Sequence, residues 1–289
     1  MRIDSHQHFW SLGMFPHGWI KPELKAIHRS FGPNDLKPLL DKHQLDGSVL
    51  VQTFSSLEET RWFLTLASQH DFIRGVVGWV DLADPDVGET VDGLMDHPKF
   101  VGVRHVVHDE PDPLWLTRDA VQAGLGALAS LGVPYDFLIR PQHLSAALQV
   151  AQRHPELRLI VDHIAKPRIA DRGWDDWAVG IAELASYPNV WCKLSGMITE
   201  ASWTAWKADD LKRYVHHVVE VFGPGRLLFG TDWPVCLLAG SYDRAVQALE
   251  ATLPQMSDSE LKGIWGENAA KFYDLDGPGV EPSSPTARS

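Results

Sequence analysis

Eight short apolar runs alternate with helix-like segments along almost the whole chain, and this alternation limits the possible folds more than any other feature. The runs are rich in Val, Ile and Leu, as is typical of strands buried on both faces of a parallel sheet. They occupy residues 2–6, 48–52, 73–80, 100–105, 134–139, 157–163, 189–194 and 226–232. Such alternation predicts an α/β fold, and about eight strands in about 230 residues match a (β/α)8 or TIM barrel.

The segments between the runs support this prediction. Residues 57–70 and 144–154 repeat apolar side chains at steps of three and four, and residues 210–222 end at a Gly-Pro-Gly stop. A doubly wound sheet is the alternative, but no GxGxxG motif follows the first run. We therefore predict one barrel domain over residues 1–275 with an extra C-terminal helix at 257–273. The Pro-, Ser- and Gly-rich residues 276–289 are expected to form a disordered tail.

Composition excludes several classes of partner. The chain has 289 residues with 26 Lys and Arg against 38 Asp and Glu, a net charge of -12, which argues against nucleic acid or an anionic membrane. The two cysteines provide no disulfide framework, and no apolar run is long enough to span a membrane or act as a secretory signal. We expect a cytoplasmic protein with a small-molecule partner; the oligomeric state is left open.

Histidine and aspartate residues stand where the first, sixth and eighth runs end. The alternation of a strand predicts three sets that each share a face: Asp4, His6 and His8; Leu159, Val161 and His163; Leu228, Gly230 and Asp232. Each residue alone is weak evidence, since the chain has 14 His and an Asp before Trp-Pro can cap a turn. Together, His6, His8, His163 and Asp232 at one barrel mouth predict acid–base chemistry or ligation of Zn²⁺.

Four segments in chain order carry a family resemblance. They are DSHQHFW (4–10), DHIAKP (162–167), CKLSGM (192–197) and LLFGTDWPVC (227–236). These segments resemble the amidohydrolase superfamily, in particular its sugar-lactonase branch of L-fuconolactonases, L-rhamnonolactonases and pyrone-dicarboxylate lactonases. WPVCLLAGSYD (233–243) is most similar to the fuconolactonase members. The resemblance implies a TIM barrel that hydrolyses a cyclic ester, such as a sugar aldonolactone.

Two departures from the superfamily bear on metal binding. Its binuclear members carry a carboxylated lysine on the fourth strand and a histidine on the fifth, whereas here these runs end at Arg104-His105 and Ile139-Arg140. We therefore predict that no two-metal site forms. His6, His8, His163 and Asp232 can still hold a single Zn²⁺. Lactonases of this branch are generally described as working without a divalent metal, so we predict that no cofactor is required, with one Zn²⁺ as the alternative.

For lactone hydrolysis, Asp232 is the predicted general base on water. His6, His8 and His163 are predicted to polarise the carbonyl by donating hydrogen bonds. A bound ion would instead act as the Lewis acid, and the sequence does not separate these two routes.

Substrate contacts are predicted for five further residues: Arg104, Gln52, Lys193, Lys166 and Trp10. The first three stand at strand ends, Lys166 follows His163, and Trp10 can stack on a sugar ring. The loops around residues 10–27 and 109–115 are expected to select the lactone. Lys166 can either face the site or close a loop, and the roles of Trp19 and His105 also stay open.

Two other functions are compatible with these residues. A Zn-dependent decarboxylase or hydrolase of the same superfamily, acting on an unsaturated or aromatic acid, would lose activity on chelation. A non-catalytic barrel would bind a sugar without turnover and would tolerate Asp232→Asn.

Overall fold

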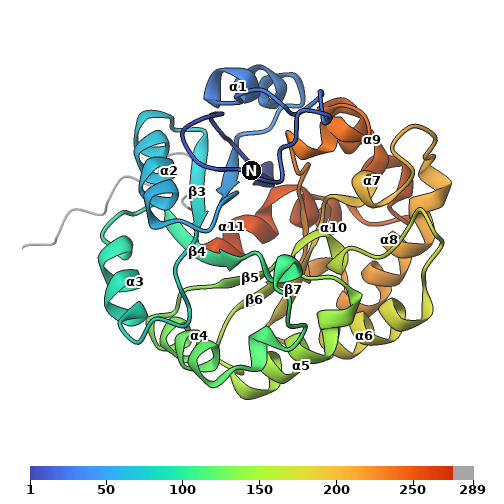
Figure 1. Cartoon of the computed structure of the whole chain (residues 1–289). Coiled ribbons are helices and arrows are strands. Elements are labelled where there is room, and N and C mark those ends of the chain that lie inside the picture. Colours follow the sequence, from blue (N-terminus) through green and yellow to red (C-terminus); the bar gives the residue numbers. More distant parts are fainter. Residues whose placement is uncertain (276–289) are drawn as a thin grey trace, which may run out of the picture.

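The computed structural model describes residues 1–275, so the predicted tail at 276–289 lies outside the described residues. Its centre is one sheet of eight parallel strands in sequence order (Figure 1). The strands are β1 (Ile3–Gln7), β2 (Gly47–Val51), β3 (Ile73–Gly78), β4 (Phe100–His105), β5 (Tyr135–Phe137), β6 (Leu159–Val161), β7 (Val190–Leu194) and β8 (Leu227–Phe229). Each strand pairs with the next, which confirms the predicted TIM barrel.

The barrel closes between β1 and β8 just beyond the ends of the two strands. The Asp232 backbone N–H donates to the His6 carbonyl at 2.8 Å, and the His8 N–H donates to the Trp233 carbonyl at 2.7 Å. Closure therefore places Asp232 beside both histidines of the first strand, although more than 220 residues separate them in sequence.

Helices form the outer ring around the sheet (Figure 1). They are α1 (Pro33–Lys42), α2 (Leu57–Gln69), α3 (Val87–Met95), α4 (Asp119–Leu131), α5 (Leu144–Arg153), α6 (Asp175–Ala185), α7 (Met197–Glu200), α8 (Ala208–Phe222) and α9 (Tyr242–Thr252), followed by α10 (Asp258–Lys262) and α11 (Asn268–Tyr273). Short 3-10 turns occupy Val107–Asp109, Trp115–Thr117, Pro141–His143, Asp162–Ala165, Pro224–Arg226 and Val235–Leu238. The helices predicted at 57–70, 144–154 and 210–222 are thus confirmed within two residues. Within residues 1–275, no helix combines the length and the apolar character needed to cross a bilayer.

The predicted C-terminal helix is present but broken. A π-helical turn at Gly263–Glu267 separates α10 from α11. A Cβ on Gly266 would lie 2.5 Å from the Met1 carbonyl oxygen and 2.7 Å from the Ile3 backbone nitrogen. Glycine therefore lets this turn pack directly against the start of β1, a contact that helical periodicity does not reveal.

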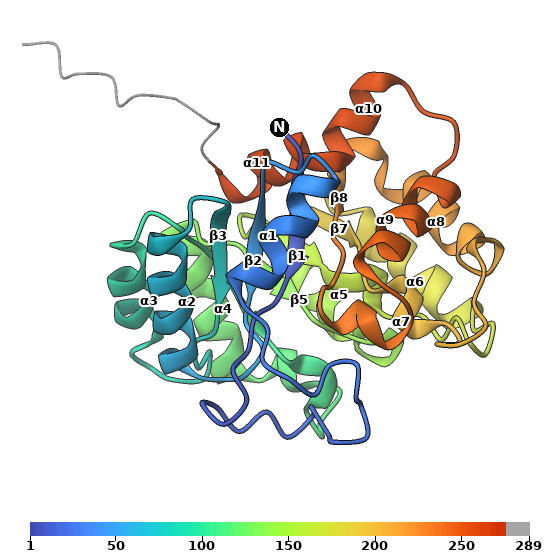
Figure 2. The same ribbon diagram turned by 90° about the horizontal axis from the view of Figure 1, so that it is seen from above.

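Helix α11 closes the end of the barrel where the strands begin. Figure 2 shows α11 on this side and the long loop of residues 10–32, in blue, on the opposite side. Phe272 and Tyr273 of α11 pack with the innermost apolar side chains, which are Ile3, Val49, Val51, Val77, Ile160 and Leu228. Because this end is filled by apolar groups, a ligand can enter the barrel only from the carboxyl ends of the strands.

Candidate active site

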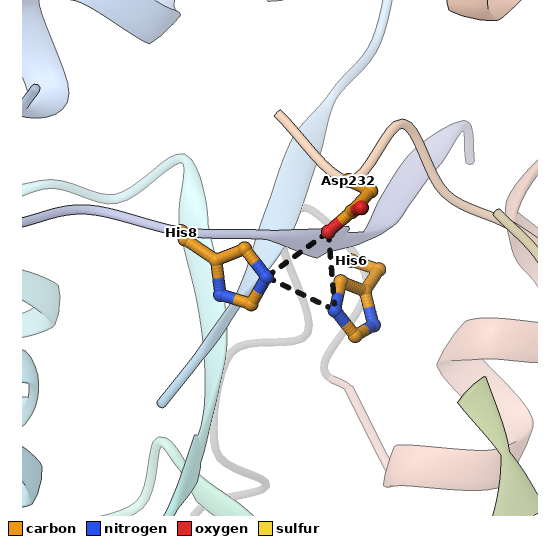
Figure 3. A group of neighbouring side chains, drawn as sticks. All are labelled: His6, His8 and Asp232. Carbon is orange, nitrogen blue, oxygen red and sulfur yellow. Dashed lines mark hydrogen bonds and ion pairs between the residues drawn. The ribbon is translucent and has the colours of Figure 1, made fainter. Parts of the chain in front are cut away.

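His6, His8 and Asp232 meet at the carboxyl ends of β1 and β8 (Figure 3). His8 Nε2 lies 3.2 Å from both His6 Nε2 and Asp232 Oδ1. The same carboxylate oxygen is 3.8 Å from His6 Nε2 and 3.8 Å from His163 Nε2. The structure therefore brings together all four residues predicted to form the catalytic group.

Asp4 does not share the face of these histidines, contrary to the predicted alternation. The pairing register of β1 with β2 shifts between Asp4 and Gln7. The Asp4 carboxylate accepts hydrogen bonds from the Thr231 backbone N–H at 2.9 Å and from the Tyr242 hydroxyl of α9 at 3.0 Å. Since an irregularity of one residue reverses the faces of a strand, Asp4 faces the helix layer while His6 faces the interior.

His163 also reaches the mouth by a route that alternation does not predict. Ile160 belongs to the innermost apolar group, whereas Leu159 and Val161 pack in the outer core, so the inward face of β6 leads to Asp162. After β6 the backbone turns left-handed, with φ of 53° at His163 and 49° at Ile164. This turn redirects the imidazole into the mouth, where its Nδ1 lies 2.8 Å from the Ser195 hydroxyl. Expecting Leu159, Val161 and His163 on one inward face was wrong, although the predicted place of His163 is confirmed.

The protonation of His8 follows from its partner. Its Nδ1 lies 2.7 Å from the Val51 carbonyl oxygen, and a carbonyl can only accept. Nδ1 therefore carries hydrogen, and a neutral His8 presents the lone pair of Nε2 to the Asp232 carboxylate. Two such acceptors at 3.2 Å repel each other unless a proton or a cation lies between them.

Burial and charge set the other ionisation states of the cluster. Burial alone raises the pKa of Asp232, but His163 and the hydrogen bond from His8 outweigh it and hold that pKa well below its usual range. Burial lowers the pKa of His163 to about 3, and the carboxylate of Asp232 offsets this only in part. Burial likewise lowers the pKa of His6, against the attraction of Asp162. At neutral pH Asp232 is therefore an ionised carboxylate beside the neutral imidazoles of His6 and His163.

Beneath His6 lies a fully buried ionic layer that sequence reasoning missed in part. Asp162 accepts from Arg104 Nη1 at 3.0 Å and pairs with Lys193 Nζ at 2.9 Å, while Lys193 also pairs with Asp136 at 2.6 Å. Arg104 Nη1 and Lys193 Nζ each lie 3.2 Å from a nitrogen of His6. The motif at 162–167 contained Asp162, but only His163 and Lys166 were selected from it. Nothing local in the sequence distinguished Asp136.

A cavity of about 600 Å³ opens above the cluster. Its floor contains His8, Arg104, His163 and Asp232. Its walls come from the loops that follow six strands: Trp19; Thr53, Phe54 and Ser55; His105, Val106, His108, Asp109, Glu110 and Pro111; Leu138 and Arg140; Lys166; Val235. The volume suits a small molecule of the size of one sugar ring.

Of the five predicted substrate contacts, the cavity is lined by Arg104 and Lys166 alone. Lys193 lies below the floor in the ionic layer. Gln52 lies behind Arg104. Its Nε2 donates to the Arg104 backbone carbonyl at 3.3 Å, and the Arg104 guanidinium donates to the backbone carbonyl of Gln52. The prediction that Lys193 and Gln52 contact a ligand directly is therefore corrected. Both residues instead support side chains of the cavity floor.

Trp10 is likewise placed behind the cavity wall. It is fully buried, its indole N–H donates to the Arg29 carbonyl at 2.7 Å, and its ring meets Trp19 edge to face at 5.3 Å. Trp19, whose role was left open, is the tryptophan on the wall. The prediction of stacking by Trp10 is thus corrected: the ring supports Trp19.

Comparisons with known proteins agree with this geometry. The family model described as Amidohydrolase matches residues 3–275. This chain belongs to the amidohydrolase family. The amidohydrolase is 39% identical to an L-fucono-1,5-lactonase of Burkholderia ambifaria, with 96% of this chain and 97% of the relative aligned. It is 37% identical to an L-fucono-1,5-lactonase of Burkholderia multivorans over the same shares. A crystal structure of an amidohydrolase from Burkholderia multivorans with bound zinc superposes with a TM-score of 0.91 at 36% identity, covering 96% of this chain and 100% of that one.

The donor atoms of this amidohydrolase fit a single divalent ion. Ligand atoms of His6, His8 and Asp232 all lie within 4.8 Å of one another. Tetrahedral bonds of about 2.0–2.1 Å to one ion place neighbouring ligand atoms about 3.3 Å apart. This is close to the 3.2 Å that separates His8 Nε2 from His6 Nε2 and from Asp232 Oδ1. His6, Asp162 and His163 form a second group with similar spacing, but Arg104 Nη1 and Lys193 Nζ already pair with Asp162 at 3.0 and 2.9 Å.

Proposed function

We propose that this protein is a carboxylic-ester hydrolase that opens a sugar aldonolactone, L-fucono-1,5-lactone or a close relative, to its acid. The observation that carries the proposal is the ionised Asp232 on the floor of a ring-sized cavity, beside Arg104 and the histidines. The likeness to L-fuconolactonases over 96% of the chain supports the choice of substrate. Hydrolysis adds water to the lactone carbonyl, breaks the ring C–O ester bond and returns a proton to the leaving alkoxide.

Asp232 is the proposed general base. It lies on the cavity floor and its low pKa keeps it ionised at neutral pH. The carboxylate can accept the proton of a water that attacks the carbonyl and can pass it to the ring oxygen as the ester bond breaks. His163, 3.8 Å from the same oxygen, helps to orient that water.

Arg104 replaces His8 as the proposed donor to the carbonyl oxygen. His8 Nδ1 donates to the Val51 carbonyl and its Nε2 faces Asp232 Oδ1 at 3.2 Å, so His8 has no ring N–H free to donate to a substrate carbonyl as the sequence predicted. Arg104 lines the cavity, and its guanidinium is held by Asp162 and by the Gln52 carbonyl. A fixed cation at the carbonyl stabilises the developing oxyanion, and loss of one such donor typically costs about 10²–10³ in kcat.

The site can also hold one Zn²⁺ at His6, His8 and Asp232, next to His163. Such an ion would supply Lewis acidity and a more acidic water. We propose that turnover does not require it, because Arg104 already provides positive charge on the cavity floor. A small neutral lactone is the proposed partner, rather than nucleic acid or a membrane, and the cytoplasm is the proposed compartment.

The test combines metal removal with one substitution. Wild-type protein, with and without chelator treatment and with zinc quantified, is assayed for acid release from L-fuconolactone, L-rhamnonolactone and L-galactonolactone. Turnover should persist after chelation and fall at least about 10³-fold in Asp232→Asn. The control is Asp209→Asn, an exposed carboxylate on the outer helix α8, which should be fully active.

Each other outcome points to a different function. Turnover that vanishes on chelation and returns with zinc would make the ion essential. Release of CO₂ from an unsaturated or aromatic acid, with no lactone turned over, would indicate the decarboxylase. Sugar binding without turnover, unchanged in Asp232→Asn, would indicate a non-catalytic barrel.

A further inference from the structure

We propose that Glu110 binds a ring hydroxyl of the lactone and so determines which lactones are accepted. This inference rests on the proposed function. Glu110 lies on the wall of the catalytic cavity, in the loop at 109–115 that was expected to select the lactone, although the sequence did not single out this residue. His105 holds its carboxylate, and Trp79 and Trp115 in turn hold His105.

The proton on His105 is determined by Trp79. The indole Nε1–H of Trp79 lies 2.9 Å from His105 Nδ1, and an indole nitrogen can only donate. His105 Nδ1 must therefore carry the lone pair. The remaining ring proton is on Nε2, which donates to Glu110 Oε1 at 2.7 Å. Burial also lowers the pKa of His105, against the attraction of Glu110, so the ring is neutral.

The imidazole of His105 is held rigidly. It stacks on Trp115 with ring centroids 4.1 Å apart and planes at 8°. The His105 side chain is 12% exposed and that of Glu110 is 24% exposed. Glu110 therefore has one oxygen fixed against a buried ring. Within the described part of the chain, its other oxygen, Oε2, has no hydrogen-bond partner.

A carboxylate in this position selects for hydroxyl donors. An ionised carboxylate only accepts hydrogen bonds, and the hydroxyls of a sugar lactone are the donors that the substrate offers. The two ester oxygens are acceptors, so Glu110 repels them and favours the orientation in which they face Arg104. Because its orientation is fixed in advance, little side-chain entropy is lost on binding. A lactone without hydroxyls leaves Oε2 unpaired and gains nothing from it.

The experiment compares a hydroxylated with an unsubstituted lactone. Wild type and Glu110→Gln are assayed on L-fuconolactone and on δ-valerolactone, which has the same ester but no ring hydroxyl. For Glu110→Gln, kcat/KM should fall about 10- to 100-fold on L-fuconolactone, the usual effect of losing a hydrogen bond to a charged group. It should change less than about twofold on δ-valerolactone. If δ-valerolactone reacts too slowly, it is tested as an inhibitor of L-fuconolactone hydrolysis. Its inhibition constant should then be equal in wild type and Glu110→Gln.

Trp79→Phe tests the positioning of the carboxylate. This change removes the indole donor and frees His105 to take the other tautomer, so it should reduce kcat/KM on L-fuconolactone only, and by less than Glu110→Gln. Equal losses on both lactones, or no loss on either, would overturn the role of Glu110. Failure of the wild type to open any lactone would instead reject the proposed function.

Discussion

Asp136 gives the buried ionic layer a measurable pH signature. Burial raises its pKa to about 6 from an ordinary value of 3.8, against the opposing pull of Lys193. A carboxyl with a higher pKa in the folded chain binds its proton more tightly there. It therefore adds stability below its unfolded pKa, and this contribution is lost as pH rises through its folded pKa. A rise of roughly two pKa units corresponds to on the order of 3 kcal/mol.

The perturbation is Asp136→Asn, which keeps an oxygen to accept from Lys193 and Tyr273 but cannot titrate. Urea unfolding of wild type and variant at about pH 4.5 and about pH 7.5 gives two differences in unfolding free energy. As the pH rises from about 4.5 to about 7.5, the unfolding free energy of the wild type should fall by about 2 kcal/mol relative to that of the variant. Most of the titration of Asp136 falls in this window. Comparing differences removes the titrating groups that do not interact with Asp136, and Asp209→Asn serves as an exposed control.

A difference that is the same at both pH values would refute this reasoning. It would mean that Lys193 fully offsets the burial of Asp136 and keeps it ionised throughout. A difference that grows in favour of the wild type as pH rises would mean that Asp136 has a lowered pKa, as a strong buried ion pair requires.

Two further predictions concern how the loops support the site. Gly196 has φ of 62°, and a Cβ there would lie 2.5 Å from His163 Nδ1, whereas Gly132 has φ of 71° with nothing within 4 Å. Both alanine variants should be destabilised by about 1 kcal/mol or more in thermal unfolding, but only Gly196→Ala should lose lactone turnover, about 10-fold or more; equal activities would contradict this. His17, buried and 2.9 Å from the Thr53 hydroxyl, anchors the loop that carries Trp19. His17→Ala should raise KM several-fold with little change in kcat, and the exposed His28→Ala on the same loop should not; a fall in kcat alone would argue against an anchoring role.

The sequence determined the architecture because each strand and each helix has a local pattern of apolar residues. Eight runs separated by helical segments predicted the barrel, and the rule that polar groups follow strand ends selected His6, His8, His163 and Asp232. The same rule selected Arg104, which lines the cavity, but also Gln52 and Lys193, which lie behind or below it. Such predictions need only the position of a residue along its own strand.

Tertiary structure decided what depends on partners from distant strands. The register shift in β1 turned Asp4 outward, and the left-handed turn at His163 replaced the predicted face of β6, since neither irregularity has a periodic signal. Asp136 gained its role only because the barrel places β5 and β7 on either side of β6, within reach of the Lys193 ammonium. Glu110 likewise depends on Trp79, which follows the preceding strand. Side-chain alternation is a property of one strand, whereas charge pairing and hydrogen-bond direction arise only when closure brings several strands to the same place.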